Sequence, residues 1–165
     1  MAKLTGTGLA AFAKSKVGTP YVYGAKGADG KFTLARLNSL RKSYPSMFTA
    51  NYYAKAKKFV GRVCCDCSGL ISWYTGKVLG SSQLYATATK KKRINKANIS
   101  EIPVGAVVWK SGHVGVYIGN GKVVEAMGID YGTRITVLKN RTFTHWLLFE
   151  NYMTYGTKKK TAKKK

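Results

Sequence analysis

The stretch VCCDCSGLISWYTG, residues 63–76, decides the fold, because it places all three cysteines of the chain directly before an apolar segment. The apolar residues of that segment recur at the spacing of a buried helix, and Asp66 is placed to cap its first turn. Free N–H groups and the positive end of the helix dipole at such a start stabilise a thiolate. Cys67 is therefore a candidate nucleophile, whereas Cys64 and Cys65 are expected to pack as small apolar residues.

The three clustered cysteines also suggest structural alternatives. A disulfide between adjacent or nearly adjacent cysteines is strained, and a zinc site normally takes four ligands from two separated pairs. The chain has only two histidines, His113 and His145, to complete such a set. We therefore expect no metal and no other cofactor, which leaves inert buried thiols or a nucleophile.

A thiolate nucleophile requires a base and an orienting partner for that base. His113 opens the β-branched run HVGVYIGN, and Gly112 and Gly115 beside it are expected to leave room for a substrate. If the next hairpin has a three-residue loop, residues 119–121, Gly115 lies opposite Glu125 and Glu125 shares a face with His113. A two-residue loop would put Glu125 on the other face. The alternative is an ordinary strand end and an exposed carboxylate.

The order of the predicted elements indicates one α+β domain. Helices are expected over residues 5–17, 32–43 and 49–60 and from Cys67 onward, and short strands separated by turns are expected from residue 101. Residues 81–99 are expected to be loop and irregular helix. No apolar run is long enough to cross a membrane.

The charge is strongly positive, with 29 lysines and arginines against 6 aspartates and glutamates and a net charge of +23. Six of the lysines lie in the last eight residues, KKKTAKKK. The chain without these residues still has a net charge of +17 (23 minus 6), so it is basic as well. Such a charge favours encounters with polyanions, among them nucleic acid, anionic wall polymers and acidic membranes. The excess of lysine over arginine argues against base-specific readout, and a merely solubilising basic surface is the other reading.

Three motifs, VGTPYVYGA, DCSGL and GHVGVYIGNG, occur in this order between residues 17 and 127. Together they closely resemble the NlpC family of bacterial and phage cell-wall cysteine peptidases. The resemblance implies a papain-like α+β fold, with the nucleophile at a helix N-terminus packed against an antiparallel sheet. It also implies that Cys67 is the nucleophile, His113 the base and Glu125 the third catalytic residue.

Supporting roles at the site follow from the same resemblance. Tyr21 falls on the family's tyrosine near the nucleophile, and the flanking Asp66 and Ser68 are expected to cap the helix and to let the substrate approach. The chain departs from the family in two ways. Relatives often carry His, Asn or Gln where this chain has Glu125, and a helical segment, residues 28–62, lengthens the gap before the nucleophile.

The resemblance implies a hydrolase of peptidoglycan stem peptides, cutting an amide next to D-glutamate, as an endolysin or a wall-remodelling enzyme. We expect a monomer with one domain, residues 1–155, and an unstructured lysine-rich tail, residues 156–165. The basic surface and tail are expected to bind anionic wall polymers. The N-terminal residues lack the pattern of a secretory signal, so we expect action on the wall after phage lysis, from a phage tail or by another export route. The alternative function is a basic nucleic-acid-binding or virion protein with non-catalytic cysteines.

Overall fold

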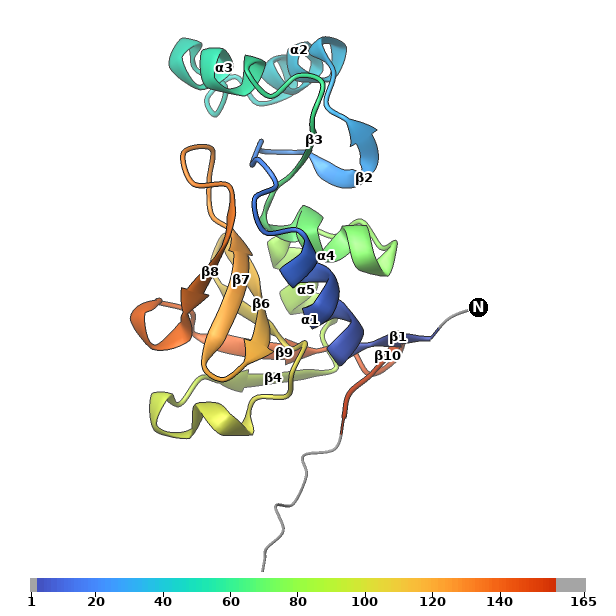
Figure 1. Cartoon of the computed structure of the whole chain (residues 1–165), viewed down its shortest axis with the longest axis vertical. Helices are drawn as coiled ribbons and strands as arrows, with labels where there is room; N and C mark the ends of the chain where they lie inside the picture. Colours follow the sequence, from blue (N-terminus) through green and yellow to red (C-terminus); the bar gives the residue numbers. More distant parts are fainter. Residues whose placement is uncertain (1–2, 157–165) are drawn as a thin grey trace, which may run out of the picture.

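A six-stranded antiparallel sheet forms most of the C-terminal half of the chain in the computed structural model, which describes residues 3–156 (Figure 1). The strand order is β4-β9-β5-β6-β7-β8. The strands are β4 (Lys90–Arg93), β5 (Val107–Lys110), β6 (His113–Gly119), β7 (Lys122–Ala126), β8 (Thr133–Val137) and β9 (His145–Leu148). Helices precede this sheet in the chain, so the predicted α+β class is confirmed.

Five α-helices lie before the sheet or at its start, and most begin at a side chain that caps them. They are α1 (Gly6–Ser15), α2 (Leu34–Ser43), α3 (Ala50–Lys57), α4 (Cys67–Thr75) and α5 (Ser81–Thr87). The hydroxyls of Thr5, Thr33 and Thr49 accept an amide N–H from the first turns of α1, α2 and α3, and Asp66 does the same for α4. The predicted helices are therefore present, and α5 and β4 occupy much of the segment expected to be irregular.

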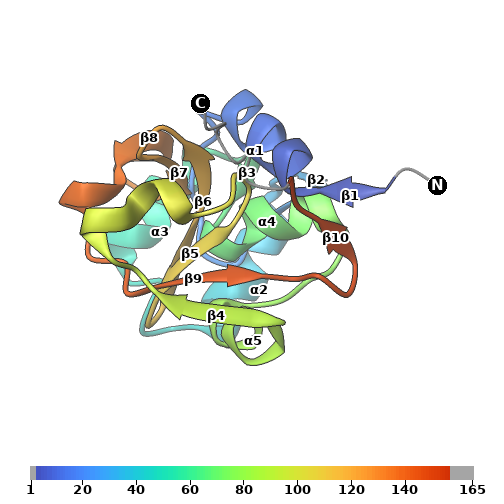
Figure 2. The same ribbon diagram turned by 90° about the horizontal axis from the view of Figure 1, so that it is seen from below.

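The sheet is covered on both faces, and two apolar clusters result. Helices α1 and α4 pack on one face around a buried cluster that includes Leu9, Leu70 and Val114. The other face buries Val108, Trp146 and their neighbours beneath the short helices η1 (Lys96–Glu101) and η2 (Leu138–Asn140). Figure 2 shows α1 and α4 on one side of the sheet. This sandwich fixes the start of α4 beside β6.

The segment between Tyr21 and Cys67 has a core of its own. Strand β2 (Lys26–Lys31) pairs with β3 (Val63–Cys65), and α2 and α3 lie between them in the sequence. Their apolar side chains form a third cluster, made of Val22, Ala25, Phe32, Leu37, Leu40, Phe48, Ala56 and Cys64. In Figure 1 these two helices stand apart from the large sheet, at the top of the view.

The hairpin between β6 and β7 differs from the prediction in its loop. Gly119 pairs with Lys122, so the loop is the two residues Asn120 and Gly121, both with positive φ (53° and 74°), and not the expected three. A bulge between Tyr117 and Gly119 then shifts the register by one residue. The bulge cancels the effect of the shorter loop, and so Glu125 still shares a face with His113.

Two further features complete the described part of the chain. Strand β1 (Leu4–Thr5) pairs in parallel with β10 (Met153–Thr154), which brings the two ends of the described chain together. None of the helices within residues 3–156 combines the length and the apolar character needed to cross a bilayer. The lysine-rich tail predicted from residue 156 onward lies almost wholly outside the described residues.

Candidate active site

Cys67 is the first residue of α4, directly after the turn that leaves β3. The amide of Cys65 donates to the carbonyl of Pro20 (3.1 Å), and the amide of Asp66 donates to the carbonyl of Ala25 (2.8 Å). These bonds hold the entry to the helix from both sides. The N–H groups of the first turn of a helix have no acceptor within the helix. The amide of Cys67, the first residue of α4, is therefore free to donate to a group outside the helix.

The carboxylate of Asp66 holds this helix start in place. One oxygen accepts the amide of Gly69 (2.7 Å), and the other accepts the amide of Gly24 (2.9 Å). The ammonium of Lys26 donates to both oxygens (3.0 and 3.1 Å) and to the hydroxyl of Ser68 (3.2 Å). The predicted cap is thus present, and Asp66 and Ser68 flank Cys67 as part of one network. Lys26 was missed by the sequence analysis.

His113 is hydrogen-bonded to Glu125 and lies near enough to Cys67 for the thiol to affect its pKa. Its Nε2 lies 2.7 Å from Oε1 of Glu125, and Nδ1 is therefore the ring nitrogen left for the Cys67 thiol. Burial disfavours the charged ring, but hydrogen bonds to Cys67 and Glu125 outweigh it and raise the pKa of His113 to about 9. The charged ring stabilises the folded chain fully below the unfolded pKa of about 6.5, and this contribution is lost as pH rises through about 9.

Glu125 is wholly buried, with no solvent-exposed surface. Besides His113 it is bound by the guanidinium of Arg141, whose Nε and Nη2 donate to its two oxygens (2.8 and 2.7 Å), and by the hydroxyl of Thr136 (2.5 Å). Burial alone would raise the pKa of this carboxyl group, but the three partners lower it to about 2. Its stabilising contribution is therefore present above pH ~4.3 and is lost only as pH falls toward about 2.

Phe143 completes the surroundings of His113. Its ring stacks on the imidazole, with 5.5 Å between ring centroids and 17° between planes. Of the two glycines expected to leave room for a substrate beside His113, only Gly112 does so. Gly112 lines the groove that holds Cys67, whereas a Cβ on Gly115 would lie 3.1 Å from Cβ of Glu125. The space at Gly115 is therefore filled by the side chains of Val123 and Glu125 on the neighbouring strand and is not open to a substrate.

A groove of about 500 Å³ opens beside Cys67. Tyr21 lines it, and burial, followed by the nearby charges of Cys67 and Asp66, raises the pKa of its hydroxyl, so Tyr21 stays protonated. Arg36 and Leu40 of α2 also line the groove, together with Tyr44, the residue that ends this helix. The inserted segment thus shapes the groove at the candidate nucleophile.

The other two cysteines lie in β3 and point into different cores. Cys64 belongs to the cluster of the inserted helices and Cys65 to the cluster under α4, as their expected apolar packing requires. Burial raises the pKa of the Cys64 thiol to about 11 and that of Cys65 to about 12. All three cysteines are free thiols. Within residues 3–156, no three His, Cys, Asp or Glu side chains are grouped so that they could hold a metal ion.

The structure therefore brings together all six residues that the sequence singled out, and it adds several that the sequence did not. No recognisable sequence motif contains the added residues Arg141, Thr136, Phe143 and Lys26. A physical argument could have suggested Arg141. A carboxylate on the buried face of a sheet requires a charged partner, and the chain has few arginines that could be that partner.

Alkylation by iodoacetamide at neutral pH is expected to modify Cys67 and to spare Cys64 and Cys65. Cys67 lines a groove and keeps 9% of its surface exposed, whereas Cys64 and Cys65 are at most 1% exposed and have raised pKa values. Peptide mass spectrometry of the native protein gives the site of labelling, with Cys67→Ala as the control. Equal labelling of all three cysteines in the folded protein would contradict the assignment.

NMR titration of His113 is expected to give a midpoint well above 6.5 in the wild type. Cys67→Ala and Glu125→Gln should each lower this midpoint, because each removes a partner that stabilises the protonated ring. A wild-type midpoint near 6.5, or variants that leave it unchanged, would show that these contacts do not govern the protonation of His113.

Several solved structures share this fold. NlpC1 from Trichomonas vaginalis superimposes with a TM-score of 0.55 at 17% identity, over 87% of this chain and 43% of that one. The NlpC/p60 domain of the peptidoglycan hydrolase SagA gives 0.54 at 20% identity, over 87% of this chain and 98% of that one. This chain thus spans less than half the length of the Trichomonas protein, and these likenesses show the fold.

A third solved structure is RipD from Mycobacterium tuberculosis, with a TM-score of 0.52 at 18% identity over 87% of this chain and 96% of that one. It is described as a non-catalytic NlpC/p60 domain protein adapted to peptidoglycan binding. Comparison with curated protein sequences gives no match. The model of the NlpC/P60 family matches residues 18–150, which include every residue of the site described above. The chain therefore belongs to the NlpC/P60 family.

Proposed function

We propose that the protein is a cysteine peptidase that cleaves an amide bond in the stem peptides of peptidoglycan. The observation that carries this proposal is the chain of contacts at the start of α4. The thiol of Cys67 at a helix N-terminus is close enough to the imidazole of His113 to raise its pKa, and one nitrogen of that imidazole lies 2.7 Å from a buried carboxylate. A nucleophile, a base and an orienting partner are the parts that covalent acyl transfer requires.

The reaction proceeds in two halves. Cys67 gives its proton to His113, and the thiolate attacks the amide carbonyl to form an S–C bond. As the C–N bond breaks, His113 returns the proton to the leaving amine, which leaves an acyl-enzyme and a neutral imidazole. Neutral His113 then takes a proton from water, whose oxygen attacks the thioester. The S–C bond breaks, and the proton passes from His113 back to the Cys67 sulfur.

The negative oxygen that develops in both halves requires hydrogen-bond donors. The amide of Cys67 at the free end of α4 is one donor, and the protonated hydroxyl of Tyr21 in the same groove is a second. A backbone hydrogen bond holds the two segments that carry these donors together. The amide of Cys65, two residues before Cys67, donates to the carbonyl of Pro20, the residue before Tyr21. Preorganised donors of this kind lower the barrier without reorganising during the reaction.

The substrate assignment rests on the family and on the shape of the groove. An open groove beside Cys67, walled by α2, suits an extended peptide. Cleavage next to D-glutamate and a role in phage lysis belong to the same proposal, and both rest on the motif resemblance alone. A peptidoglycan-binding role without catalysis is the second candidate, because RipD is described in those terms; the intact contacts of Cys67, His113 and Glu125 favour catalysis here.

Digestion of purified peptidoglycans that differ in stem peptide and cross-link is expected to release fragments with new amine and carboxyl ends. The Cys67→Ala variant, which lacks the nucleophile, should release none, and Cys64→Ala should retain the activity because that thiol lies in another core. Mass analysis of the soluble fragments identifies the bond. If wild type and Cys67→Ala give the same fragments while both bind the polymer, the protein binds peptidoglycan without cutting it.

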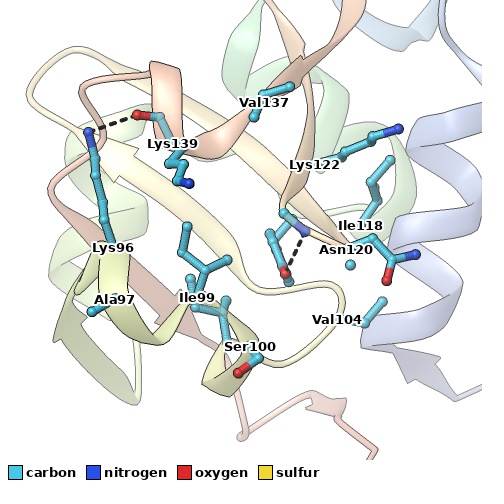
Figure 3. Close-up of a pocket in the computed structure, with 14 residues that line it drawn as sticks. Lys96, Ala97, Ile99, Ser100, Val104, Ile118, Asn120, Lys122, Val137 and Lys139 are labelled. Atoms are coloured by element: carbon cyan, nitrogen blue, oxygen red, sulfur yellow. Dashed lines mark hydrogen bonds between the residues drawn. The ribbon is translucent and has the colours of Figure 1, made fainter.

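We also propose that a basic hollow far from the nucleophile helps to retain the protein on anionic wall polymers. The hollow, of about 800 Å³, lies between η1, η2 and the β6–β7 turn (Figure 3). Lys96, Lys122 and Lys139 line it, and no acid is among the described residues that line it. It lies at the end of β6 opposite His113, roughly 20 Å away at about 3.3 Å per residue. An anionic segment bound there would leave the groove free.

Binding of the inactive Cys67→Ala protein to cell walls is expected to weaken as salt rises from low to physiological levels. Adding Lys122→Glu and Lys139→Glu should weaken it further than Lys31→Glu and Lys42→Glu, a control with the same change in charge on the inserted segment. Co-sedimentation measures both. Salt-independent binding would overturn the electrostatic proposal, and equal losses in the two pairs would overturn the role of the hollow. Salt-sensitive binding to DNA, with no wall binding, would favour the nucleic-acid alternative.

A further inference from the structure

Glu125 has two cationic partners on its two sides. Oε1 lies 2.7 Å from Nε2 of His113 and accepts from Nη2 of Arg141 at 2.7 Å, while Oε2 accepts from Nε of Arg141 at 2.8 Å. The carboxylate is wholly buried, whereas about a quarter of the Arg141 side chain is exposed. A buried charge that loses its partner is strongly destabilised, so the state of one cation affects the protonation of the other.

The loop that carries Arg141 also carries Phe143, which stacks on His113. The Arg141 guanidinium lies 5.7 Å from the Phe143 ring, so both contacts come from one short, mutually packed segment. The ammonium of Lys96 fixes this segment from outside, because it donates to the carbonyls of Lys139 (3.0 Å) and Arg141 (3.2 Å). Figure 3 shows the first of these bonds, from η1 across to η2. The loop is thus held by Lys96 on one side and by its contacts with Glu125 and His113 on the other.

We propose that Arg141 is a positioning residue that keeps Glu125 ionised while His113 is neutral, and so allows the second half of the reaction. This inference rests on the proposed function. In the acyl-enzyme, His113 has given its proton to the leaving amine and has to stay neutral until it accepts one from water. Without Arg141, the buried charge of Glu125 would have no cationic partner in that state and only the neutral hydroxyl of Thr136 to bind it, and His113 would be held in its protonated form, unable to act as a base.

The direction of the effect follows from charge alone. Removing a positive group from the far side of Glu125 makes the pair of His113 and Glu125 bind a proton more tightly. A charge at this distance shifts a neighbouring pKa by about 1–3 units; because the charge acts through Glu125, we expect a rise of about 1 unit for His113. The pH range in which neutral His113 is available moves up by the same amount, so deacylation slows at neutral pH and the acyl-enzyme accumulates.

The test compares wild type with Arg141→Met, Arg141→Lys and a matched control, Arg134→Met. Arg134 is exposed on β8 opposite Glu125 in the strand register, and its loss changes the net charge equally. Arg141→Met is expected to raise the NMR midpoint of His113, to lower kcat more than kcat/KM at pH 7, and to show the acyl-enzyme mass on Cys67. Arg141→Lys should give a smaller change in the same direction, and Arg134→Met should resemble wild type.

Three outcomes would overturn the proposal. The first is a folded Arg141→Met protein whose His113 midpoint is unchanged and which forms no acyl-enzyme. The second is an Arg141→Met protein that loses kcat and kcat/KM equally. The third is an Arg134→Met protein whose His113 midpoint shifts as much as that of Arg141→Met. If Arg141→Met does not fold, Arg141→Lys decides by the direction of its midpoint. The titration needs no substrate, so it tests Arg141 even if wild type cleaves no peptidoglycan, an outcome that would count against the proposed function instead.

Discussion

The carboxylate of Asp66 is the point on which the site depends. It is almost wholly buried and is bound by two backbone amides and one ammonium, each from a different segment: the first turn of α4, the loop at Gly24, and β2 at Lys26. A single acid therefore sets where α4 begins, how the segment after Tyr21 runs and where the inserted unit leaves the domain. Because Cys67 is the next residue, its position is defined by the same contacts.

Much of the fold follows from local signals in the sequence. Apolar spacing marks α1, α2, α3 and α4, and β-branched runs mark the central strands. The charged strand β4, Lys90–Arg93, and the polar strand β2, Lys26–Lys31, were missed. Both are edge strands whose formation depends on hydrogen bonds offered by a neighbour, β9 for one and β3 for the other. Side-chain composition carries little information about such pairing.

The candidate site shows the same division. Cys67 and His113 were predicted because a helix start and a strand start can be recognised locally. Glu125 was predicted on the correct face through an incorrect loop, since a two-residue turn and a bulge at Ile118 combine to the register that a longer loop would have given. Arg141 and Phe143 lie in a loop without periodicity, and only the assembled sheet shows that they meet Glu125 and His113.

The inserted helices bury their apolar side chains in a cluster that shares no member with the two clusters of the sheet. The two parts meet through a polar contact instead, because Arg36 of α2 donates to the carbonyl of Gly24 (2.7 Å), whose amide donates to Asp66. The shape of the groove can therefore vary through α2 while the apolar packing around the start of α4 stays the same.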